Sequence, residues 1–207
     1  RTDAGTAAAA LTESGRLWYS TVLPPSDAAA ESTIHPVELT AQVPGTVTAL
    51  VLDGRGETLS VGTADGHLYH WDVRETGHPV LLERHKVSPS GTAVTALAYL
   101  IGDRSLVIGT STGEVAVWMP VRVTEESNQT RLQAVHHFAP HPAAVTGISP
   151  SQRDKGFITG DRQGNLFVHY ATSAQTLLRF PGDSAAIRSL MFAPKANGAV
   201  AVTETGQ

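Results

Sequence analysis

The sequence of 207 residues contains no cysteine and only three lysines, Lys86, Lys155 and Lys195. Without cysteine, a disulfide framework and a thiolate metal site are both excluded, although this absence fits reducing and oxidising compartments equally well. The net charge is −4 and the basic residues are scattered along the chain. Because nucleic-acid binding needs clustered positive charge, we expect no nucleic-acid partner.

Long apolar runs are also missing. No stretch approaches the roughly 18 apolar residues that cross a bilayer as a helix. No stretch keeps an apolar period of about 3.6 residues either, so we do not expect amphipathic helices. The chain begins with Arg1, without a methionine or a signal-like segment. We therefore expect a segment cut from a longer protein.

What the sequence does contain is a repeated unit. Residues 47–73, 94–119 and 145–171 each begin with Val-Thr, continue through a polar turn, and reach a second, glycine-containing turn followed by an aromatic-rich strand. Partial copies lie at residues 11–22 and 187–207. A repeat of about 40–50 residues with three or four strands per unit is typical of a β-propeller. The turn glycines of the units are Gly15, Gly66, Gly113, Gly164 and Gly206.

The repeats predict one all-β domain over residues 1–207, a propeller segment with about four blades or partial blades. We assign residues 1–10 to a flexible lead-in. Ala7–Leu11 could be part of this frayed lead-in or a strand equivalent to Ala199–Val202, and we favour a weak strand. The repeat units span about 11–46, 47–93, 94–144, 145–186 and 187–207.

Period-2 alternation and turn residues place the strands within these units. In the first unit, a Pro- and Ala-rich surface loop, Pro24–Pro36, should precede an outer strand at Val37–Val43. Further strands are expected at Arg16–Val22, Val47–Leu52, Thr58–Thr63, His67–Val73, Val80–Arg84, Val94–Leu100, Ser105–Ile108, Glu114–Trp118, Leu132–Phe138, Val145–Ser149, Gly156–Gly160, Asn165–Ala171 and Gln175–Phe180.

The two ends of the chain indicate whether the blades close into a ring. Ala7–Leu11 resembles Ala199–Val202, so both ends carry the same second strand of a unit. A closed four-bladed ring would pair Arg16–Val22 with Ala199–Thr203 and would not need that strand twice. We therefore expect an open arc, an excerpt of a larger propeller, that self-associates through its open blade edges.

Several residues carry a resemblance to the WD40 family. Trp71-Asp72 matches the family's closing dipeptide, Asp65-Gly66 its hairpin turn, and His141 its Gly-His histidine. The pattern is degenerate, because no unit holds the full His, Ser/Thr, Asp and Trp set, and the chain resembles a divergent bacterial WD40-like propeller. The structural repeat positions that the resemblance implies are Asp65, Gly66, Trp71, Gly113, Trp118 and Gly164.

A second resemblance is to the extracytoplasmic domain of some bacterial permease subunits of the phosphate ABC transporter. It rests on the general style of residues 62–79, GTADGHLYHWDVRETGHP, and on the Ala- and Arg-rich, cysteine-free composition. It implies a place on the extracytoplasmic, periplasmic face of the inner membrane as part of a membrane protein. A cytoplasmic interaction scaffold is the alternative.

Two motifs resemble functional sites, but a structural interpretation is favoured for each. Gly109–Gly113 spells G-x-S-x-G, yet a nucleophile elbow needs a strand-to-helix turn, and here a strand follows. His136, His137 and His141 are close in sequence and could hold zinc. However, adjacent strand residues face opposite sides, so His136 and His137 cannot enter one site without a bulge. We expect no metal at this cluster.

Two further groups of residues are also interpreted as structural rather than functional. Asp161-Arg162 is interpreted as part of a solvated rim rather than a catalytic dyad. Aromatic residues on the third strand of each unit should lie in the core between blades. These residues are Tyr69, Trp71, Trp118 and Phe167.

No nucleophile, base and orienting group recur together, so we expect no enzyme and no cofactor. The leading hypothesis is a non-catalytic interaction or regulatory module that contacts a protein partner or neighbouring domains of its own polypeptide. The alternative is a small-ligand or anion sensor at the central channel. Its candidate residues are Arg55, Arg104, Arg153 and Lys195.

Overall fold

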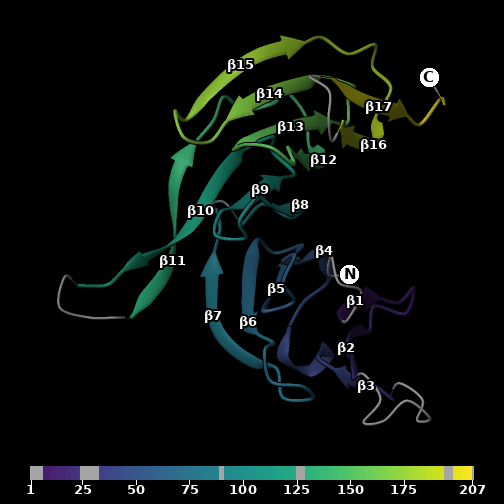
Figure 1. Cartoon of the computed structure of the whole chain (residues 1–207). Helices are drawn as coiled ribbons and strands as arrows, with labels where there is room; N and C mark the ends of the chain where they lie inside the picture. The colour runs from purple at the N-terminus through teal and green to yellow at the C-terminus, as the bar shows by residue number, and fades with distance from the viewer. Residues whose placement is uncertain (1–6, 24–32, 89–90, 125–128, 194–197, 207) are drawn as a thin grey trace, which may run out of the picture.

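The computed structural model describes residues 7–23, 33–88, 91–124, 129–193 and 198–206, and arranges them as successive antiparallel sheets. We name these sheets blades A to E in chain order (Figure 1). Blade A contains β1 (Ala7–Leu11), β2 (Leu17–Leu23) and β3 (Thr33–Glu38), followed by the 3-10 helix η1 (Thr40–Gln42). Blade E contains β16 (Ile187–Phe192) and β17 (Ala199–Thr203).

Blades B, C and D each have four strands paired in chain order. Blade B contains β4 (Val47–Leu52), β5 (Thr58–Thr63), β6 (His67–Asp72) and β7 (Val80–Lys86). Blade C contains β8 (Val94–Tyr99), β9 (Leu106–Thr110), β10 (Val115–Arg122) and β11 (Thr130–His137). Blade D contains β12 (Val145–Pro150), β13 (Gly156–Asp161), β14 (Leu166–Tyr170) and β15 (Gln175–Phe180).

The turn between the second and third strand of each full blade ends in a glycine with positive φ. The φ values are +82° at Gly66, +87° at Gly113 and +84° at Gly164, a region that other residues enter only with strain. The next blade also approaches these turns closely. A Cβ atom on Gly113 would lie 2.2 Å from the backbone oxygen of His141, so glycine is required there for two independent reasons.

A second set of glycines couples one blade to the next. Each lies on a second strand, and a Cβ atom there would overlap the first residue of the next blade's inner strand. We call these positions glycine sites, and they pair Gly62 with Val94 (2.3 Å), Gly109 with Val145 (2.6 Å) and Gly160 with Ile187 (2.9 Å). In blade E, the equivalent position in the sheet register is Val202, which is 38% exposed.

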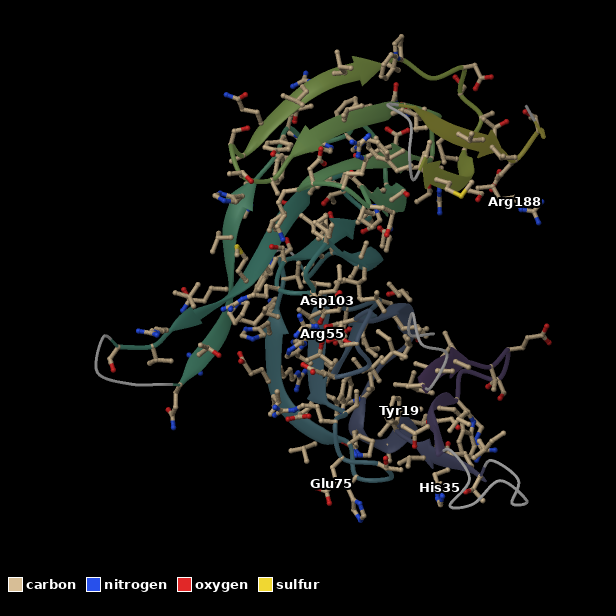
Figure 2. All side chains as sticks on the ribbon, in the orientation of Figure 1. Tyr19, His35, Arg55, Glu75, Asp103 and Arg188 are labelled. Carbon is tan, nitrogen blue, oxygen red and sulfur yellow. The ribbon has the colours of Figure 1, made fainter. Side chains whose placement is uncertain are left out.

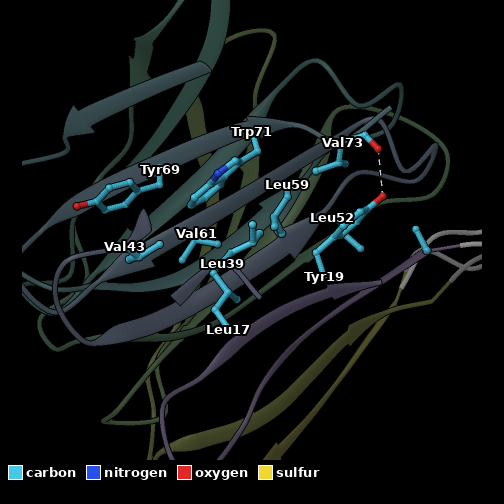
Figure 3. Close-up of a cluster of buried hydrophobic side chains, with 11 residues drawn as sticks. Leu17, Tyr19, Leu39, Val43, Leu52, Leu59, Val61, Tyr69, Trp71 and Val73 are labelled. Atoms are coloured by element: carbon cyan, nitrogen blue, oxygen red, sulfur yellow. Dashed lines mark hydrogen bonds between the residues drawn. The ribbon is translucent and has the colours of Figure 1, made fainter. Parts of the chain in front are cut away.

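The core consists of separate clusters between neighbouring blades. Between blades A and B, Leu17 and Tyr19 pack against Leu59 and Trp71 (Figure 3). The Tyr19 hydroxyl also donates to the Val73 backbone oxygen at 3.1 Å. Burying a large apolar side chain contributes about 1.5–3 kcal/mol, so each cluster is a strong inter-blade contact. The aromatic residues assigned to the core are all buried, as predicted: Tyr69, Trp71, Trp118 and Phe167.

The blades follow one another along an open arc, with blade A at one end and blade E at the other (Figure 1). β2 pairs with β1 and β3, whereas β17 pairs with β16 in the part of the chain that the structure describes. The pairing expected for a four-bladed ring, of residues 16–22 with 199–203, is therefore absent from these sheets. The predicted all-β propeller with partial blades is confirmed.

The first unit holds one assignment that was right and one that was wrong. Ala7–Leu11 is a strand paired with β2, as favoured from the sequence, so residues 7–10 do not belong to a flexible lead-in; residues 1–6 lie outside the described chain. The outer strand is Thr33–Glu38, not Val37–Val43. Leu39 and Val43 are buried through η1 instead of through a strand, because this turn places both side chains in the A–B core.

The expected loop Pro24–Pro36 is likewise shortened, since its last four residues belong to β3 and residues 24–32 lie outside the described chain. Among the described residues, no helix is long and apolar enough to cross a membrane.

Candidate functional site

The repeat positions of blade B form local contacts. The Asp65 side chain is exposed and accepts hydrogen bonds from the Thr63 hydroxyl and from His67 Nδ1, the latter at 2.9 Å. The Thr63 bond is the main reason that the pKa of Asp65 is lowered. The Trp71 indole donates instead to Gln42 Oε1 at 3.1 Å. In this blade the turn aspartate and the tryptophan therefore stabilise separate parts of the fold.

Trp118 of blade C is buried, at 7% exposed, and packs edge-on against His85 of blade B with ring centroids 5.4 Å apart. Its indole nitrogen has no hydrogen-bond partner among the described residues. Ile108 stands at the position where blade D has Thr159, so blade C lacks the hydroxyl that could accept this bond.

Blade D contains a continuous buried network. The Thr176 hydroxyl lies 3.0 Å from His169 Nδ1, and His169 Nε2 lies 2.8 Å from Thr159 Oγ1. Thr159 Oγ1 is 2.6 Å from His141 Nε2, and His141 Nδ1 is 3.2 Å from Asp161 Oδ2. His169 occupies the position of Trp71 and Trp118. The network thus joins the segment before blade D to the interior of that blade.

The protonation states of the two histidines fix which group donates and which accepts in each hydrogen bond of the network. Burial lowers the pKa of His141, and burial together with nearby positive charge lowers the pKa of His169 to about 3, so both imidazoles are neutral at pH 7. An ionised Asp161 can only accept, so His141 Nδ1 carries a proton and His141 Nε2 accepts from Thr159. By the same logic, His169 Nε2 donates to Thr159, and His169 Nδ1 accepts from Thr176.

The assignment of Asp161 to a solvated rim was wrong. Its side chain is fully buried and also accepts from the backbone N–H groups of Gln163 and Asn165, both at 2.9 Å. Of the Asp161-Arg162 pair, only Arg162 is exposed. Sequence reasoning missed the role of Asp161 because its partner, His141, lies 20 residues away.

The three histidines considered for zinc do not converge. His141 belongs to the buried network, His137 is exposed, and His136 lines a separate small cleft between blades C and D. Within the described ranges, no group of three His, Cys, Asp or Glu residues is arranged to hold a metal ion.

The G-x-S-x-G motif, residues 109–113, forms the hairpin between β9 and β10. Ser111 is exposed on this turn, and no helix follows it. The hairpin interpretation is therefore confirmed.

The arginines proposed for an anion site lie on loops between the first and second strands of successive blades. Arg55, Arg104 and Arg153 are all exposed, and Lys195 lies outside the described residues. These loops contact one another, because the Gly54 N–H donates to Asp103 Oδ1 at 3.1 Å, and Figure 2 shows Arg55 and Asp103 close together. The structure thus places three cations on adjacent loops, accompanied by a carboxylate.

A polar cluster that the sequence did not indicate lies between blades B and C. Ser60 Oγ is 2.9 Å from both His70 Nδ1 and Tyr99 OH, and Tyr99 OH is 3.2 Å from Thr58 Oγ1. Ser60 is fully buried between these partners, which excludes it as an accessible nucleophile. Burial lowers the pKa of His70 and raises that of Tyr99, so both are neutral at pH 7.

The described arc ends at blade E. Among the described residues, blade E has two strands where blades B, C and D have four, and a cleft of about 860 Å³ lies between blades D and E. Its walls include Leu178 and Phe180 of β15, which are 55% and 49% exposed, and Phe192 of β16. This apolar cleft next to a two-stranded sheet is the principal candidate for binding.

Comparison with known proteins supports the fold. No protein-family model matches the chain. The chain is 25% identical over 147 residues to Protein FIZZY-RELATED 1 of Arabidopsis thaliana, covering 71% of this chain and 28% of that protein. It is 26% identical over 155 residues to Meiotic fizzy-related protein 1 of Schizosaccharomyces pombe, covering 75% of this chain and 33% of that protein. The chain thus spans about a third or less of these relatives.

Among solved structures, the β-propeller domain of Myceliophteria thermophila Cps50 (Swd1) matches with a TM-score of 0.71 and 15% identity, covering 97% of this chain and 63% of that one. Together with the blade architecture, these similarities define a WD40-like β-propeller fold.

Proposed function

We propose that this chain is a non-catalytic protein-interaction module in which the edge of β17 takes up an extended segment, either of its own longer polypeptide or of a partner protein. The observation that carries the proposal is the edge of β17, which pairs with no third strand among the described residues, beside the apolar cleft between blades D and E. The WD40-like fold and the similarity to fizzy-related proteins support a protein-interaction role. Addition of a strand to a sheet edge is a common mode of peptide recognition.

The backbone register makes β17 a suitable template. The Ala193 N–H donates to the Gly198 oxygen at the hairpin, and antiparallel ladders alternate from residue to residue. The N–H groups of Ala199 and Ala201 therefore point toward the open edge. An added strand would bond to these groups and cover Leu178 and Phe180, as the third and fourth strands of a complete blade would.

The test uses a synthetic peptide of residues 67–86, because this hairpin lies beside the second strand in blade B. We expect it to bind and to slow hydrogen exchange at the amides of β17. Ala201→Pro removes an outward N–H while leaving the β16 ladder intact, and should abolish binding. Ala201→Ser keeps the N–H and is the matched control. Equal binding by the proline variant, or unprotected β17 amides, would contradict strand addition.

A second copy of the chain is another possible occupant of the edge. Light scattering over a range of concentrations measures this directly. A mass that rises with concentration in the wild type, but not in Ala201→Pro, would show that copies pair through β17. A monomer in both variants would leave the longer polypeptide of this chain or a different protein as the occupant of the edge.

A sensor of small anions is a second candidate function, favoured by the exposed Arg55, Arg104 and Arg153 on adjacent loops. Phosphate at 100 times its dissociation constant should raise the free energy of unfolding by about 2.7 kcal/mol. Substitution of all three arginines by glutamine should remove this stabilisation. No stabilisation of the wild type by phosphate or by related anions such as sulfate would exclude the sensor function.

A role in phosphate transport and an extracytoplasmic location remain proposals that rest on the resemblance of residues 62–79 and on the composition. Membrane helices encoded on either side of this segment would support both. A continuation without membrane helices would favour the cytoplasmic scaffold.

A further inference from the structure

The turn between β5 and β6 in blade B holds a negative charge. One oxygen of the Asp65 carboxylate accepts from the Thr63 hydroxyl, and the other lies 2.9 Å from His67 Nδ1. The His67 N–H in turn donates to the Thr63 hydroxyl oxygen at 3.1 Å. Gly66, between these residues, has a φ of +82°. An anion at this turn position thus has two partners, a threonine hydroxyl two residues before it and a side chain two residues after it.

The turn between β1 and β2 in blade A has the same backbone geometry. The Arg16 N–H donates to the Thr12 hydroxyl oxygen at 3.0 Å, and Gly15 has a φ of +79°. The exposed Ser14 stands where blade B has Asp65, and its hydroxyl lies 2.9 Å from that of Thr12. Two residues after Ser14, Arg16 carries a permanent positive charge. The turn of blade A therefore has both partners for an anion, but a neutral hydroxyl stands between them.

The turn of blade A is also less covered than the turns of the full blades. In blades B, C and D, the segment that leads into the next blade lies against the turn. A Cβ atom on Gly66, Gly113 or Gly164 would lie 2.6, 2.2 and 2.8 Å, respectively, from a backbone oxygen of that segment. A Cβ atom on Gly15 would meet no described residue within 4 Å. An enzyme can therefore approach Ser14 without displacing a neighbouring blade.

We propose that Ser14 is a phosphorylation site, at which Thr12 and Arg16 hold the phosphate as the carboxylate of Asp65 is held in blade B. A serine/threonine protein kinase transfers the γ-phosphoryl group of ATP to Ser14. The bond between Ser14 Oγ and phosphorus forms, the bond between phosphorus and the leaving oxygen of ADP breaks, and the hydroxyl proton passes to the base of the kinase. A basic residue at a fixed distance from the acceptor is a charge pattern that kinases use to select substrates. Blade A lies at the opposite end of the arc from β17, so this site is separate from the proposed strand addition (Figure 1).

Phosphorylation would change the partner of Arg16. In the unmodified chain, Arg16 Nε donates to Glu38 Oε1 at 2.9 Å, which joins the residue before β2 to the last residue of β3. A phosphoserine carries a charge of about −1.5 to −2 at pH 7, more than a carboxylate, so it competes for the guanidinium group. Glu38 also accepts from the Thr40 hydroxyl and keeps this donor when Arg16 turns to the phosphate. The modification therefore exchanges a contact between β2 and β3 for one within the β1–β2 turn.

The sequence contains a matched control for the enzymatic step. Ser151 also has an arginine two residues after it, Arg153, but Ser151 is only 5% exposed. The folded chain is incubated with ATP and a serine/threonine kinase that selects arginine two residues after the acceptor. Peptide mapping by mass spectrometry should find phosphate on Ser14 and not on Ser151. An unmodified Ser14, or equal modification of both serines, would overturn the proposal.

The pairing with Arg16 is tested by phosphorus NMR on a chain synthesised with phosphate on Ser14. A nearby positive charge favours the dianion, so the second pKa of the phosphate should fall by about one unit from its ordinary value of about 6. Arg16→Gln should restore the ordinary value. Phosphate on Thr112 is the matched control, because Thr112 stands at the same turn position in blade C and is followed two residues later by Glu114, so its pKa should not fall. Equal phosphate pKa values at the two sites, or no effect of Arg16→Gln, would show that Arg16 does not hold the phosphate.

Discussion

His141 Nδ1 and Asp161 Oδ2 lie 3.2 Å apart, and both side chains are completely buried. One residue precedes blade D and the other ends its second strand, so this bond fixes the entry of the chain into the blade. Because His141 also accepts from Thr159, it links the carboxylate to the remainder of the network.

Replacement of Asp161 by alanine should lower the free energy of unfolding by about 2–4 kcal/mol, because several donors lose their acceptor at once and each buried, unpaired donor costs about 1–3 kcal/mol. Urea denaturation measures the loss. Asp183→Ala is the control, since Asp183 is exposed and accepts only the Ala185 N–H among the described residues, and it should cost well under half as much. Similar losses in both variants would mean that the buried network contributes little.

The buried histidines should make stability dependent on pH. The pKa of His169 is about 3 in the folded chain and about 6.5 when unfolded, so the unfolded state binds more protons between these values. Stability is therefore complete above pH 6.5 and falls as the pH decreases toward 3, by up to about 1.4 kcal/mol per pH unit for this group. His141, whose pKa is also lowered, adds to the same trend.

His169→Trp tests the source of this dependence, because tryptophan occupies the same position in blades B and C. Urea denaturation at several pH values should show a shallower slope below pH 6.5 for this variant. The exposed His78 provides a control, and His78→Gln should keep the slope of the wild type. If His169→Trp retains the full slope, the pH dependence arises elsewhere.

Two turn glycines allow the cost of backbone strain to be measured apart from the cost of steric overlap. Gly15 and Gly113 have similar φ values, +79° and +87°, but a Cβ atom at Gly15 would meet nothing within 4 Å, whereas one at Gly113 would overlap the backbone of His141. Gly15→Ala should cost about 1–2 kcal/mol for the φ alone. Gly113→Ala should cost clearly more, as judged by thermal unfolding, and equal costs would be evidence against the close inter-blade approach.

The two buried tryptophans should respond differently to loss of the indole N–H. Trp71→Phe removes the hydrogen bond to Gln42, whereas Trp118→Phe removes a buried donor that has no described partner. Trp118→Phe should therefore be the milder change. Trp118→Ala, by contrast, should cost about 3–5 kcal/mol through the cavity it leaves. A larger loss for Trp118→Phe than for Trp71→Phe would indicate that the Trp118 indole has an acceptor after all.

The repeats predicted most of the strands correctly because their signals are local. Glycine turns such as Gly66 and Gly113 fix where one strand ends and the next begins. The alternation of residues 37–43 misled the assignment, since Leu39 and Val43 reach the core through a 3-10 turn as readily as through a strand. Binary pattern alone does not distinguish the two geometries over so few residues.

The polar groups could not be predicted in the same way, because they meet only after folding. Ser60 and Tyr99 belong to different repeats and lie 39 residues apart. Neither residue stands out in the sequence of its own strand. Asp161 stands next to Arg162 and has the sequence context of a surface loop. A comparison of equivalent positions across repeats would have revealed Ser60, His70 and Tyr99 as polar substitutions in an otherwise apolar series.

The glycine sites have a consequence for how the molecule comes apart. Blades B to E are joined by one recurring contact between neighbours, and the core is divided into separate clusters, so the arc is a one-dimensional array whose stability is a sum of unit and nearest-neighbour terms. In such an array, a single weakened junction divides the chain into cooperative blocks. Substitution of Gly109, at the junction of blades C and D, by a larger residue should turn one unfolding transition into two. Blades A to C would then unfold separately from blades D and E.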